Sequence, residues 1–145
     1  MSIGLDGWLH FPRIFVPESG LLNPTISVLL FSIGASLGFW ATFVQYKVGK
    51  GTPAPDAPTQ KLVAVGPYAF VRNPIVLGQM VAYAGFGIFF GSVSFLTIIM
   101  PLTVILHVCY LKFVEEKELE IRFGDEYRRY KEKVPMFIPK LSLKR

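Results

Sequence analysis

The fold is decided by residues 73–111, NPIVLGQMVAYAGFGIFFGSVSFLTIIMPLTVILHVCYL, which contain no Asp, Glu, Lys or Arg. At 1.5 Å per residue, one helix of this length would measure about 58 Å, nearly twice the hydrocarbon core of a bilayer. The stretch therefore has to fold back on itself. Residues that favour a tight reversal lie near its middle, namely Gly85, Gly87, Gly91, Ser92 and Ser94. We predict a helical hairpin with helices at about 75–90 and 95–113.

A second uncharged stretch precedes the hairpin. Residues 19–46 are 28 consecutive positions without a charged side chain, enough for one membrane span at about 22–44. The whole chain is 52% hydrophobic and 17% charged, which leaves more apolar surface than one small soluble core could bury. The sequence therefore predicts an all-α, polytopic membrane helical bundle of about three transmembrane helices, including the hairpin, with a cytoplasmic C-terminal helical tail.

The domain organisation follows from these spans. We predict one domain over residues 1–145, divided into an interfacial N-terminal segment 1–20, a membrane region 21–113 with a cytoplasmic loop 45–74, and a cytoplasmic tail 114–145. Trp8, Phe11 and Phe15 are aromatic residues of the kind that lie at a membrane interface. No basic stretch precedes an apolar one there, so a cleaved signal peptide is not expected.

The distribution of basic residues predicts the topology. Of 15 Lys and Arg, one lies in residues 1–20, four in 45–74 and ten from Lys112 onward. The positive-inside rule places the loop and the tail in the cytoplasm and the N-terminus outside, in a membrane that the sequence does not identify. The net charge of +5 thus indicates topology, and nucleic acid is not an expected partner. Arg128, Arg129 and Lys131 suit an anionic lipid surface, with a merely solvated face as the alternative.

Glycines spaced four apart indicate where helices approach closely. Gly34 and Gly38 form one such pair, and Gly87 and Gly91 form another. Packing within one chain explains them, and a seam between two copies is the alternative. Three spans are few for enclosing two substrates, so a homo-oligomer also stays open.

The tail has its own helical pattern. Residues 112–123 continue the last span, Gly124 is a helix stop, and Asp125 can begin another short helix. Four apolar residues follow at i, i+4, i+7 and i+11, namely Phe123, Tyr127, Tyr130 and Val134. They define one face that lies either on the membrane or on the loop. We expect a strap over the cytoplasmic mouth of the bundle.

Two polar clusters border the membrane region. Arg72 and Asn73 precede Pro74, which suits a first helical turn whose amides and dipole can hold an anionic group. Arg72 as a snorkelling anchor is the alternative. Glu115 and Glu116 follow the last span, where acidic residues are costly, so they are candidate ligand-binding residues. For Glu118 and Glu120, further along the tail, a solvated face is expected.

A metal site is not expected. Cys109 is the single cysteine, and His107 has no second histidine or carboxylate near it within the span. Packing or an interhelical hydrogen bond is the favoured role for these two residues. Phosphate-binding loops and dinucleotide fingerprints do not occur in the sequence.

Two motifs follow one another across the predicted hairpin. The first consists of Gly66, Pro67, Tyr68, Val71, Arg72, Asn73, Pro74 and Gly78. The second consists of Glu115, Glu116, Leu119, Phe123, Gly124, Tyr127, Tyr130, Val134 and Pro135. Over residues 52–141, about 60% of the chain, this arrangement resembles the isoprenylcysteine carboxyl methyltransferase and phospholipid methyltransferase superfamily.

The resemblance implies an integral membrane methyltransferase that uses S-adenosyl-L-methionine (S-adenosylmethionine) as cofactor. Its donor-binding positions fall on Gln60, Lys61, Leu62, Val63, Tyr68, Asn73, Pro74, Ile75, Val76, Glu115 and Glu116. Arg72 and Glu116 are the candidate catalytic residues. A carboxylate or ribose hydroxyls of the donor suit this mixture of cationic and acidic groups. Val71 with Leu62, Val63 and Ile75 supplies apolar side chains for the adenine.

The expected reaction is methyl transfer to a lipid or lipid-anchored acceptor at the cytoplasmic face. The acceptor is a lipophilic small molecule or a lipid-modified group, and membrane lipids are the surrounding partners. A carboxylate acceptor needs no base, whereas an amine must lose a proton to Glu116 or Tyr68. Leu111 stands where prenylcysteine enzymes carry an arginine, which weakens the case for a prenylcysteine substrate.

Other functions remain as alternatives. Asn73 and Val76 replace a histidine and a tyrosine that are common in the superfamily. The main alternative is therefore a non-catalytic membrane protein that retains the fold, with or without the donor pocket. A transporter or channel subunit has little support, because the predicted spans hold no charged residue.

Overall fold

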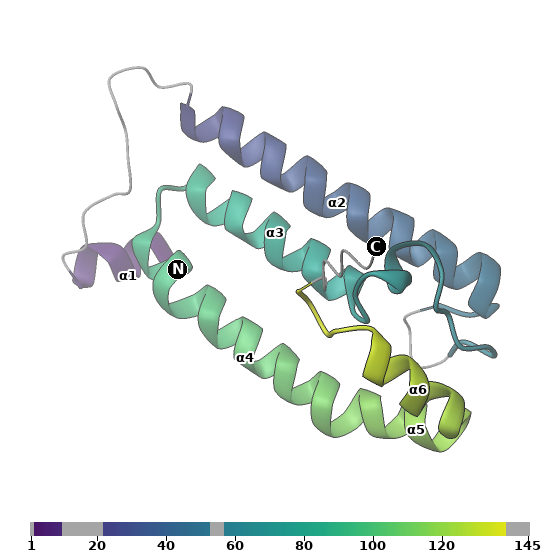
Figure 1. The fold of residues 1–145 in the computed structure, drawn as a ribbon. Helices are drawn as coiled ribbons and strands as arrows, with labels where there is room; N and C mark the ends of the chain where they lie inside the picture. Colours follow the sequence, from purple (N-terminus) through teal and green to yellow (C-terminus); the bar gives the residue numbers. More distant parts are fainter. Residues whose placement is uncertain (1, 10–21, 53–56, 139–145) are drawn as a thin grey trace, which may run out of the picture. The chain divides into compact units, whose positions relative to one another are not determined.

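The computed structural model describes residues 2–9, 22–52 and 57–138, and all regular structure in these ranges is helical (Figure 1). The prediction of an all-α fold is therefore confirmed. In chain order the helices are α1 (Ser2–Trp8), α2 (Leu22–Gly49), the short 3₁₀ helix η1 (Gly66–Ala69) and α3 (Pro74–Phe89). A continuous helix follows from Phe95 to Phe123, made of η2 (Phe95–Ile99), α4 (Met100–Tyr110), η3 (Leu111–Glu115) and α5 (Glu116–Phe123), and α6 (Asp125–Lys133) ends the series.

Two of these helices are long and apolar enough to cross a membrane. They are α2, with 28 residues, and the helix Phe95–Phe123, with 29 residues. Large apolar side chains on both are exposed, including Phe39 at 76% and Leu106 at 61%, as expected for surfaces that face lipid. The apolar helix α3 is shorter, with 16 residues. These features are those of a helical membrane protein.

The helix ends agree with the predicted ones except for α2. It ends at Gly49, five residues after the predicted 44, so the predicted loop 45–74 begins inside the helix. Gln45 to Val48 are compatible with a helix and simply extend it. The chain then turns at Lys50, whose φ of 53° is left-handed, and the amides of Gln60 and Lys61 donate to the Gly49 carbonyl at 2.7 and 3.3 Å.

The chain divides into two compact units. Unit 1 consists of Met1–Ser36 and Gly78–Cys109, and unit 2 of Leu37–Leu77 and Tyr110–Arg145. Both α2 and the helix Phe95–Phe123 contribute residues to each unit. The prediction of a single domain over residues 1–145 stays a prediction.

In unit 1, α2 and α3 approach closely at glycines (Figure 1). A Cβ on Gly34 would meet the Gly78 carbonyl and lie 2.7 Å from the Ala82 backbone nitrogen. A Cβ on Gly85 would lie 2.9 Å from the Ser27 carbonyl. Gly38 has no such neighbour within 4 Å, so of the first predicted pair only Gly34 lies at a helix contact.

The hairpin turn follows α3, as predicted. Gly91 takes a left-handed φ of 59°, and the Ser92 amide donates to the Gly87 carbonyl at 3.1 Å. Gly85 and Gly87 lie inside α3, in agreement with the predicted helix 75–90. The absence of a side chain at Gly87 makes room for Leu96.

The N-terminal helix α1 is attached to this turn. The buried carboxylate of Asp6 accepts a hydrogen bond from the Ser94 amide at 2.7 Å. Trp8, at the end of α1, is 76% exposed. Phe11 and Phe15 of the predicted interfacial segment lie outside the described residues.

Candidate functional site

An ion-pair network forms the centre of unit 2. Nη1 of Arg72 lies 2.5 Å from Oε1 of Glu116, and Nζ of Lys131 lies 2.6 Å from Oε2 of the same carboxylate. The Arg72 and Glu116 side chains are only 11% and 7% exposed, whereas Lys131 is 37% exposed. Lys131 also lies 3.0 Å from Oε1 of Glu120. Arg72 is therefore not a snorkelling anchor, because its charge is paired inside the protein.

Local sequence explains how Arg72 reaches Glu116. Val71 is buried at 3% exposure and fixes the chain just before Arg72, and Pro74 begins α3 with a nitrogen that has no proton to satisfy. Glu116 lies just after η3, where the helix takes a π turn. A turn of this kind changes the direction in which the following side chains point.

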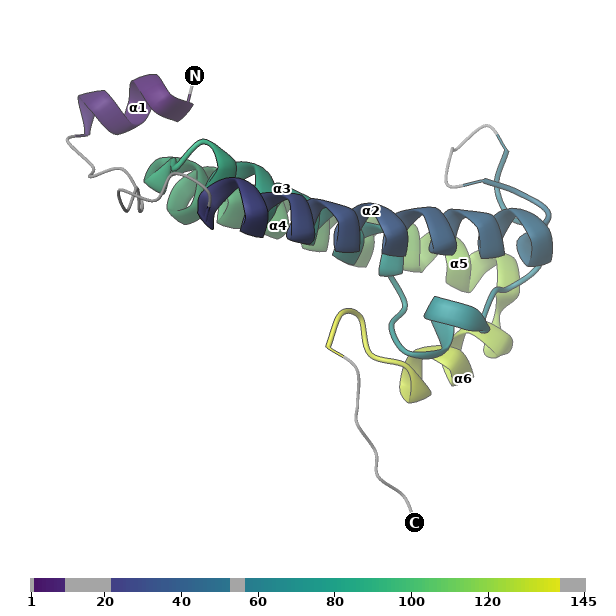
Figure 2. The same cartoon turned by 90° about the horizontal axis from the view of Figure 1, so that it is seen from above.

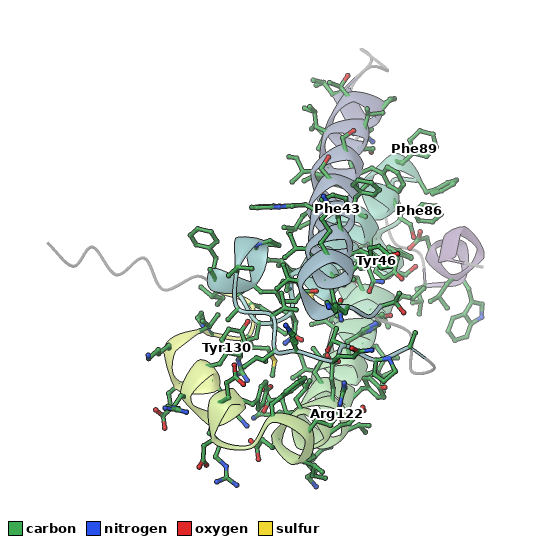
Figure 3. All side chains as sticks on the ribbon, turned by 90° about the vertical axis from the view of Figure 1, so that its right-hand side faces the viewer. Phe43, Tyr46, Phe86, Phe89, Arg122 and Tyr130 are labelled. Carbon is green, nitrogen blue, oxygen red and sulfur yellow. The ribbon has the colours of Figure 1, made fainter. Side chains whose placement is uncertain are left out.

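The tail folds back because Gly124 ends α5. Its φ of 54° and ψ of −127° suit glycine, and the chain continues directly into α6. The inward face of α6 holds Tyr127 and Tyr130, which are 2% and 9% exposed. The Tyr130 hydroxyl donates to the Tyr68 carbonyl at 2.7 Å, and Figures 2 and 3 show α6 beside η1 with Tyr130 directed to it. The sequence left this face of α6 either on the membrane or on the loop 45–74. In the structure it contacts the loop, at Tyr68.

The strap after α6 covers the approach to α3. The amide of Arg72 donates to the Pro135 carbonyl at 2.9 Å, and that of Asn73 donates to the Met136 carbonyl at 3.3 Å. The amides of the first turn of α3 were predicted to hold an anionic group, and this stays a prediction. The amides of Arg72 and Asn73, just before that turn, are occupied by the strap.

One donor in the network has no partner. Nε of Arg72 is buried and makes no hydrogen bond in the part of the chain that the structure describes. A buried N–H group without an acceptor costs about 1–3 kcal/mol, more when the group is charged. An oxygen of a bound ligand would satisfy it, and a carboxylate is the natural match for a guanidinium. The residues present therefore fit the carboxylate of S-adenosylmethionine.

Tyr68 lies in η1 next to this network. Its hydroxyl donates to Oε1 of Gln45 in α2 at 3.0 Å. Burial raises the pKa of Tyr68 above its usual value of 10.0, and the charge of Glu115 raises it further. Tyr68 thus keeps its proton, and it lies close enough to Glu115 to feel its charge. The structure brings Tyr68, Arg72, Glu115 and Glu116 into one unit.

The predicted donor segment 60–63 is held at the end of α2. The Gln60 and Lys61 side chains are exposed, Leu62 is half-buried, and Val63 is buried where Gly49 leaves room for it. Arg122 of α5 (Figure 3) donates to the Thr59 carbonyl, which ties this segment to α5. Within the first turn of α3, Pro74 is buried and Ile75 and Val76 are half-buried, as is Asn73 just before it.

An apolar pocket of about 180 Å³ lies in unit 1. Its walls come from α2 and α3, namely Ser27, Val28, Phe31, Ser32, Gly85, Phe86 and Phe89. Phe86 and Phe89 project from α3 in Figure 3. None of the predicted site residues lines this pocket.

The remaining titratable residues of the spans make local contacts. Nδ1 of His107 lies 3.0 Å from the Thr103 carbonyl one turn earlier, a bond within the helix where an interhelical one had been considered. Cys109 is exposed. No cluster of three His, Cys, Asp or Glu that could hold a metal occurs in residues 2–9, 22–52 and 57–138.

Three residues of the site were not among the predicted ones. Gln45 was assigned to a loop, Tyr127 to an apolar face and Lys131 to a lipid-facing basic cluster. The signal for Lys131 was present, because it follows Tyr127 by four residues and so lies on the same face of α6. Glu118 agrees with its predicted solvated face at 56% exposure, whereas Glu120 is 34% exposed and paired.

Comparisons with known proteins agree with the resemblance described above. The phospholipid methyltransferase family matches residues 22–126, well over half of the chain. Methanethiol S-methyltransferase 1 of Bradyrhizobium diazoefficiens is 29% identical over 133 residues, which cover 81% of this chain and 44% of that protein. The chain thus spans less than half the length of this curated relative. No solved structure matches. The chain belongs to the phospholipid methyltransferase family, within the isoprenylcysteine carboxyl methyltransferase-like superfamily.

Proposed function

We propose that the chain transfers a methyl group from S-adenosylmethionine to a lipid or lipid-anchored acceptor at the cytoplasmic face of a membrane. Family membership supports methyl transfer and makes S-adenosylmethionine the expected donor. The observation that carries the site assignment is the buried Arg72, paired with Glu116 and with an Nε that has no partner among the described residues. The proposed orientation, with the N-terminus outside and unit 2 on the cytoplasmic side, rests on the basic residues of the loop and tail.

Each polar group has a proposed role toward the donor. The Nε–H group of Arg72 donates a hydrogen bond to the carboxylate of the methyl donor, which supplies its missing partner. Glu115, which is half-buried, is available for the donor ammonium or ribose hydroxyls. Leu62, Val63, Ile75 and Val76 supply apolar surface for the adenine.

Catalysis then depends on alignment. When bound, S-adenosylmethionine supplies an electrophilic methyl group on a sulfonium, which becomes a neutral thioether as the methyl leaves. The chain holds the donor in line with the acceptor and excludes water, and positioning of this kind contributes about 7 to 11 kcal/mol. A carboxylate acceptor needs no base. An amine must first lose its proton, and Glu115 is the nearby carboxylate whose oxygens no ion pair occupies among the described residues.

A small apolar thiol is the second candidate acceptor. The relative from Bradyrhizobium is named for methanethiol, a thiol that carries a single apolar methyl group. A thiolate reacts where a thiol does not, so this acceptor also requires proton removal.

The test uses full-length protein in lipid vesicles with a donor carrying a labelled methyl group. Label in extracted lipid supports the leading proposal. Label in a volatile thioether, formed only when methanethiol is added, supports the second. Calorimetric titration of the detergent-solubilised protein with S-adenosylmethionine separates both from a non-catalytic protein, because no saturable heat and no transferred label would contradict enzymatic function.

A further inference from the structure

Lys131 is the one member of the ion network that comes from α6. Its Nζ lies 2.6 Å from Oε2 of Glu116 and 3.0 Å from Oε1 of Glu120. These bonds to Glu116 and Glu120 raise the pKa of Lys131 above its usual value, with the bond to Glu116 as the largest cause. The ammonium therefore remains charged at all physiological pH values.

Glu116 connects this lysine to the buried arginine. Its two oxygens are divided between two cations, Oε1 to Arg72 and Oε2 to Lys131. A carboxylate engaged on both sides is poorly suited to accepting a proton from a substrate. It is well suited to fixing the orientation of the Arg72 side chain and the position of α6 relative to that side chain.

The strap extends from the same helix. Val134 directly follows α6, and the next two residues provide the carbonyls that receive the amides of Arg72 and Asn73. Tyr127, four residues before Lys131, receives a bond of 3.5 Å from Nη1 of Arg72. Contacts from α6 and its strap thus reach both the side chain and the backbone of Arg72.

From this arrangement we infer that Lys131 is a positioning residue for the donor site. Through Glu116 it holds α6 and the strap residues 134–136 against Arg72, so that Nε of Arg72 points to the donor. This inference rests on the proposed function for its donor, while the link between Lys131 and the strap can be observed without any ligand.

An ordinary surface ion pair would give another result. Exposed ion pairs contribute little to stability. If Lys131 acted only through its ion pair with Glu120, its replacement would change neither the strap nor donor binding. The variant Glu120→Gln removes the negative charge of that ion pair and leaves the ion pair with Glu116. It therefore separates the two contacts of the same lysine.

The first measurement is hydrogen exchange of the full chain in lipid nanodiscs. In Lys131→Met we expect at least about tenfold faster exchange in peptides that cover residues 70–77 and 134–138, because the strap opens. Lys131→Arg should retain slow exchange. The matched control Lys133→Met, an exposed lysine of the same helix, and Glu120→Gln should both resemble the unaltered protein.

The second measurement is donor binding and turnover. Lys131→Met should raise the Kd and the KM for S-adenosylmethionine about tenfold, the loss of roughly one charge-assisted hydrogen bond, with kcat changed far less. Lys131→Arg should restore both constants. A thermal unfolding curve for each variant shows that the protein remains folded.

The outcomes are distinct. Unchanged exchange in Lys131→Met would overturn the link to the strap. Faster exchange with unchanged donor affinity would overturn the positioning role and leave Lys131 a structural residue. Unaltered protein that binds no S-adenosylmethionine would contradict the proposed function, and with it the positioning role, while exchange would still show whether Lys131 holds the strap.

Discussion

Three N–H positions of Arg72, namely Nη1, Nε and the backbone amide, have three different environments. Its Nη1 contacts Glu116 and Tyr127, its amide holds the strap, and its Nε is left without a partner among the described residues. A lysine could replace the charge but has no planar fork and no group equivalent to Nε. We therefore expect donor binding at this site to depend on arginine and not only on positive charge.

Replacing Arg72 by lysine should weaken donor binding while preserving the fold. We expect Arg72→Lys to raise the Kd for S-adenosylmethionine about 10- to 100-fold, because a hydrogen bond to a charged group contributes roughly 1.5–3 kcal/mol. Calorimetric titration measures this. The control is Arg128→Lys, whose side chain is 64% exposed and pairs only with Asp125 at the surface among described residues. Equal affinities for the two variants would contradict the assignment of Nε to the donor.

Three tyrosines of unit 2, the half-buried Tyr68 and the buried Tyr127 and Tyr130, predict how stability depends on pH. Burial raises the pKa values of Tyr68, Tyr127 and Tyr130 above the usual value of 10.0. In the unfolded chain these phenols lose their protons near that value, whereas in the folded chain they keep them. The unfolded state then binds fewer protons, so the free energy of unfolding falls as the pH rises above about 10.

An alkaline titration in detergent checks this pH dependence. It records the absorbance of tyrosinate together with helix content by circular dichroism. We expect the last tyrosinate signal to appear as helix content is lost. Tyr127→Phe should reduce the loss of stability above that pH. If all six tyrosines ionise while the helices persist, these side chains are not buried as described.

At the residue scale, sequence reasoning selected residues that the structure brings together but did not predict how they are connected. Arg72 and Glu116 were both selected, yet they stand 44 positions apart, and a pattern of residue types does not indicate which charges pair. Lys131 was assigned to a lipid surface because basic residues in a tail usually face solvent or lipid. Only the backbone conformation at Gly124 decides that α6 folds back and brings Lys131 to Glu116.

Among the elements, the contact between α2 and α3 depends on glycines, whose lack of a side chain lets the two helices approach closely. Gly34 lies against the backbone of Gly78 and Ala82, where neither neighbour can rotate away. Gly38, one turn later on α2, has open space around the position of a Cβ. The two glycines share a helix and a sequence spacing, but only Gly34 is required by packing.

This pair provides a matched comparison. We expect Gly34→Ala to lower the free energy of unfolding by about 1–3 kcal/mol, as overpacking against rigid neighbours does. Gly38→Ala should be neutral or stabilising by about 0.5–1 kcal/mol, because alanine is the better helix former. Thermal or denaturant unfolding in a fixed detergent measures both. A Gly38→Ala variant as damaged as Gly34→Ala would show that a second copy of the chain packs at Gly38.

The elements were largely predictable from apolar patterning. The start of α2 at Leu22, the limits of α3 and the stop at Gly124 follow from uncharged runs, Pro74 and glycine, which are local signals. The end of α2 was misplaced because polar residues were taken as the end of a helix, although they mark only the end of the apolar part. For the small residues near the middle of the hairpin, the sequence does not separate those that pack, such as Gly85 and Gly87, from Gly91 in the turn, because close packing and a turn both favour glycine.

For the whole molecule, the proposed topology can be tested directly. In a Cys109→Ser background, single cysteines at Phe90 and at Lys133 mark the hairpin turn and α6. We expect a membrane-impermeant maleimide added to intact cells to label Phe90→Cys and not Lys133→Cys, because the basic loop and tail place α6 in the cytoplasm. Labelling of Lys133→Cys should require permeabilisation. The reverse result would place the proposed donor site on the outer side of the membrane.

The π turn at Leu111–Glu115 also bears on how the length of the chain can vary. A π turn accommodates one residue more than an α turn. Loss of one residue from this turn would therefore leave an α turn in which the buried Leu111 and Glu116 still face nearly the same sides of the helix. Loss of one residue from the regular α4 would instead rotate Glu116 by about 100° and turn it away from Arg72. In related sequences, single-residue gaps in this part of the helix should therefore fall in the π turn and not in α4.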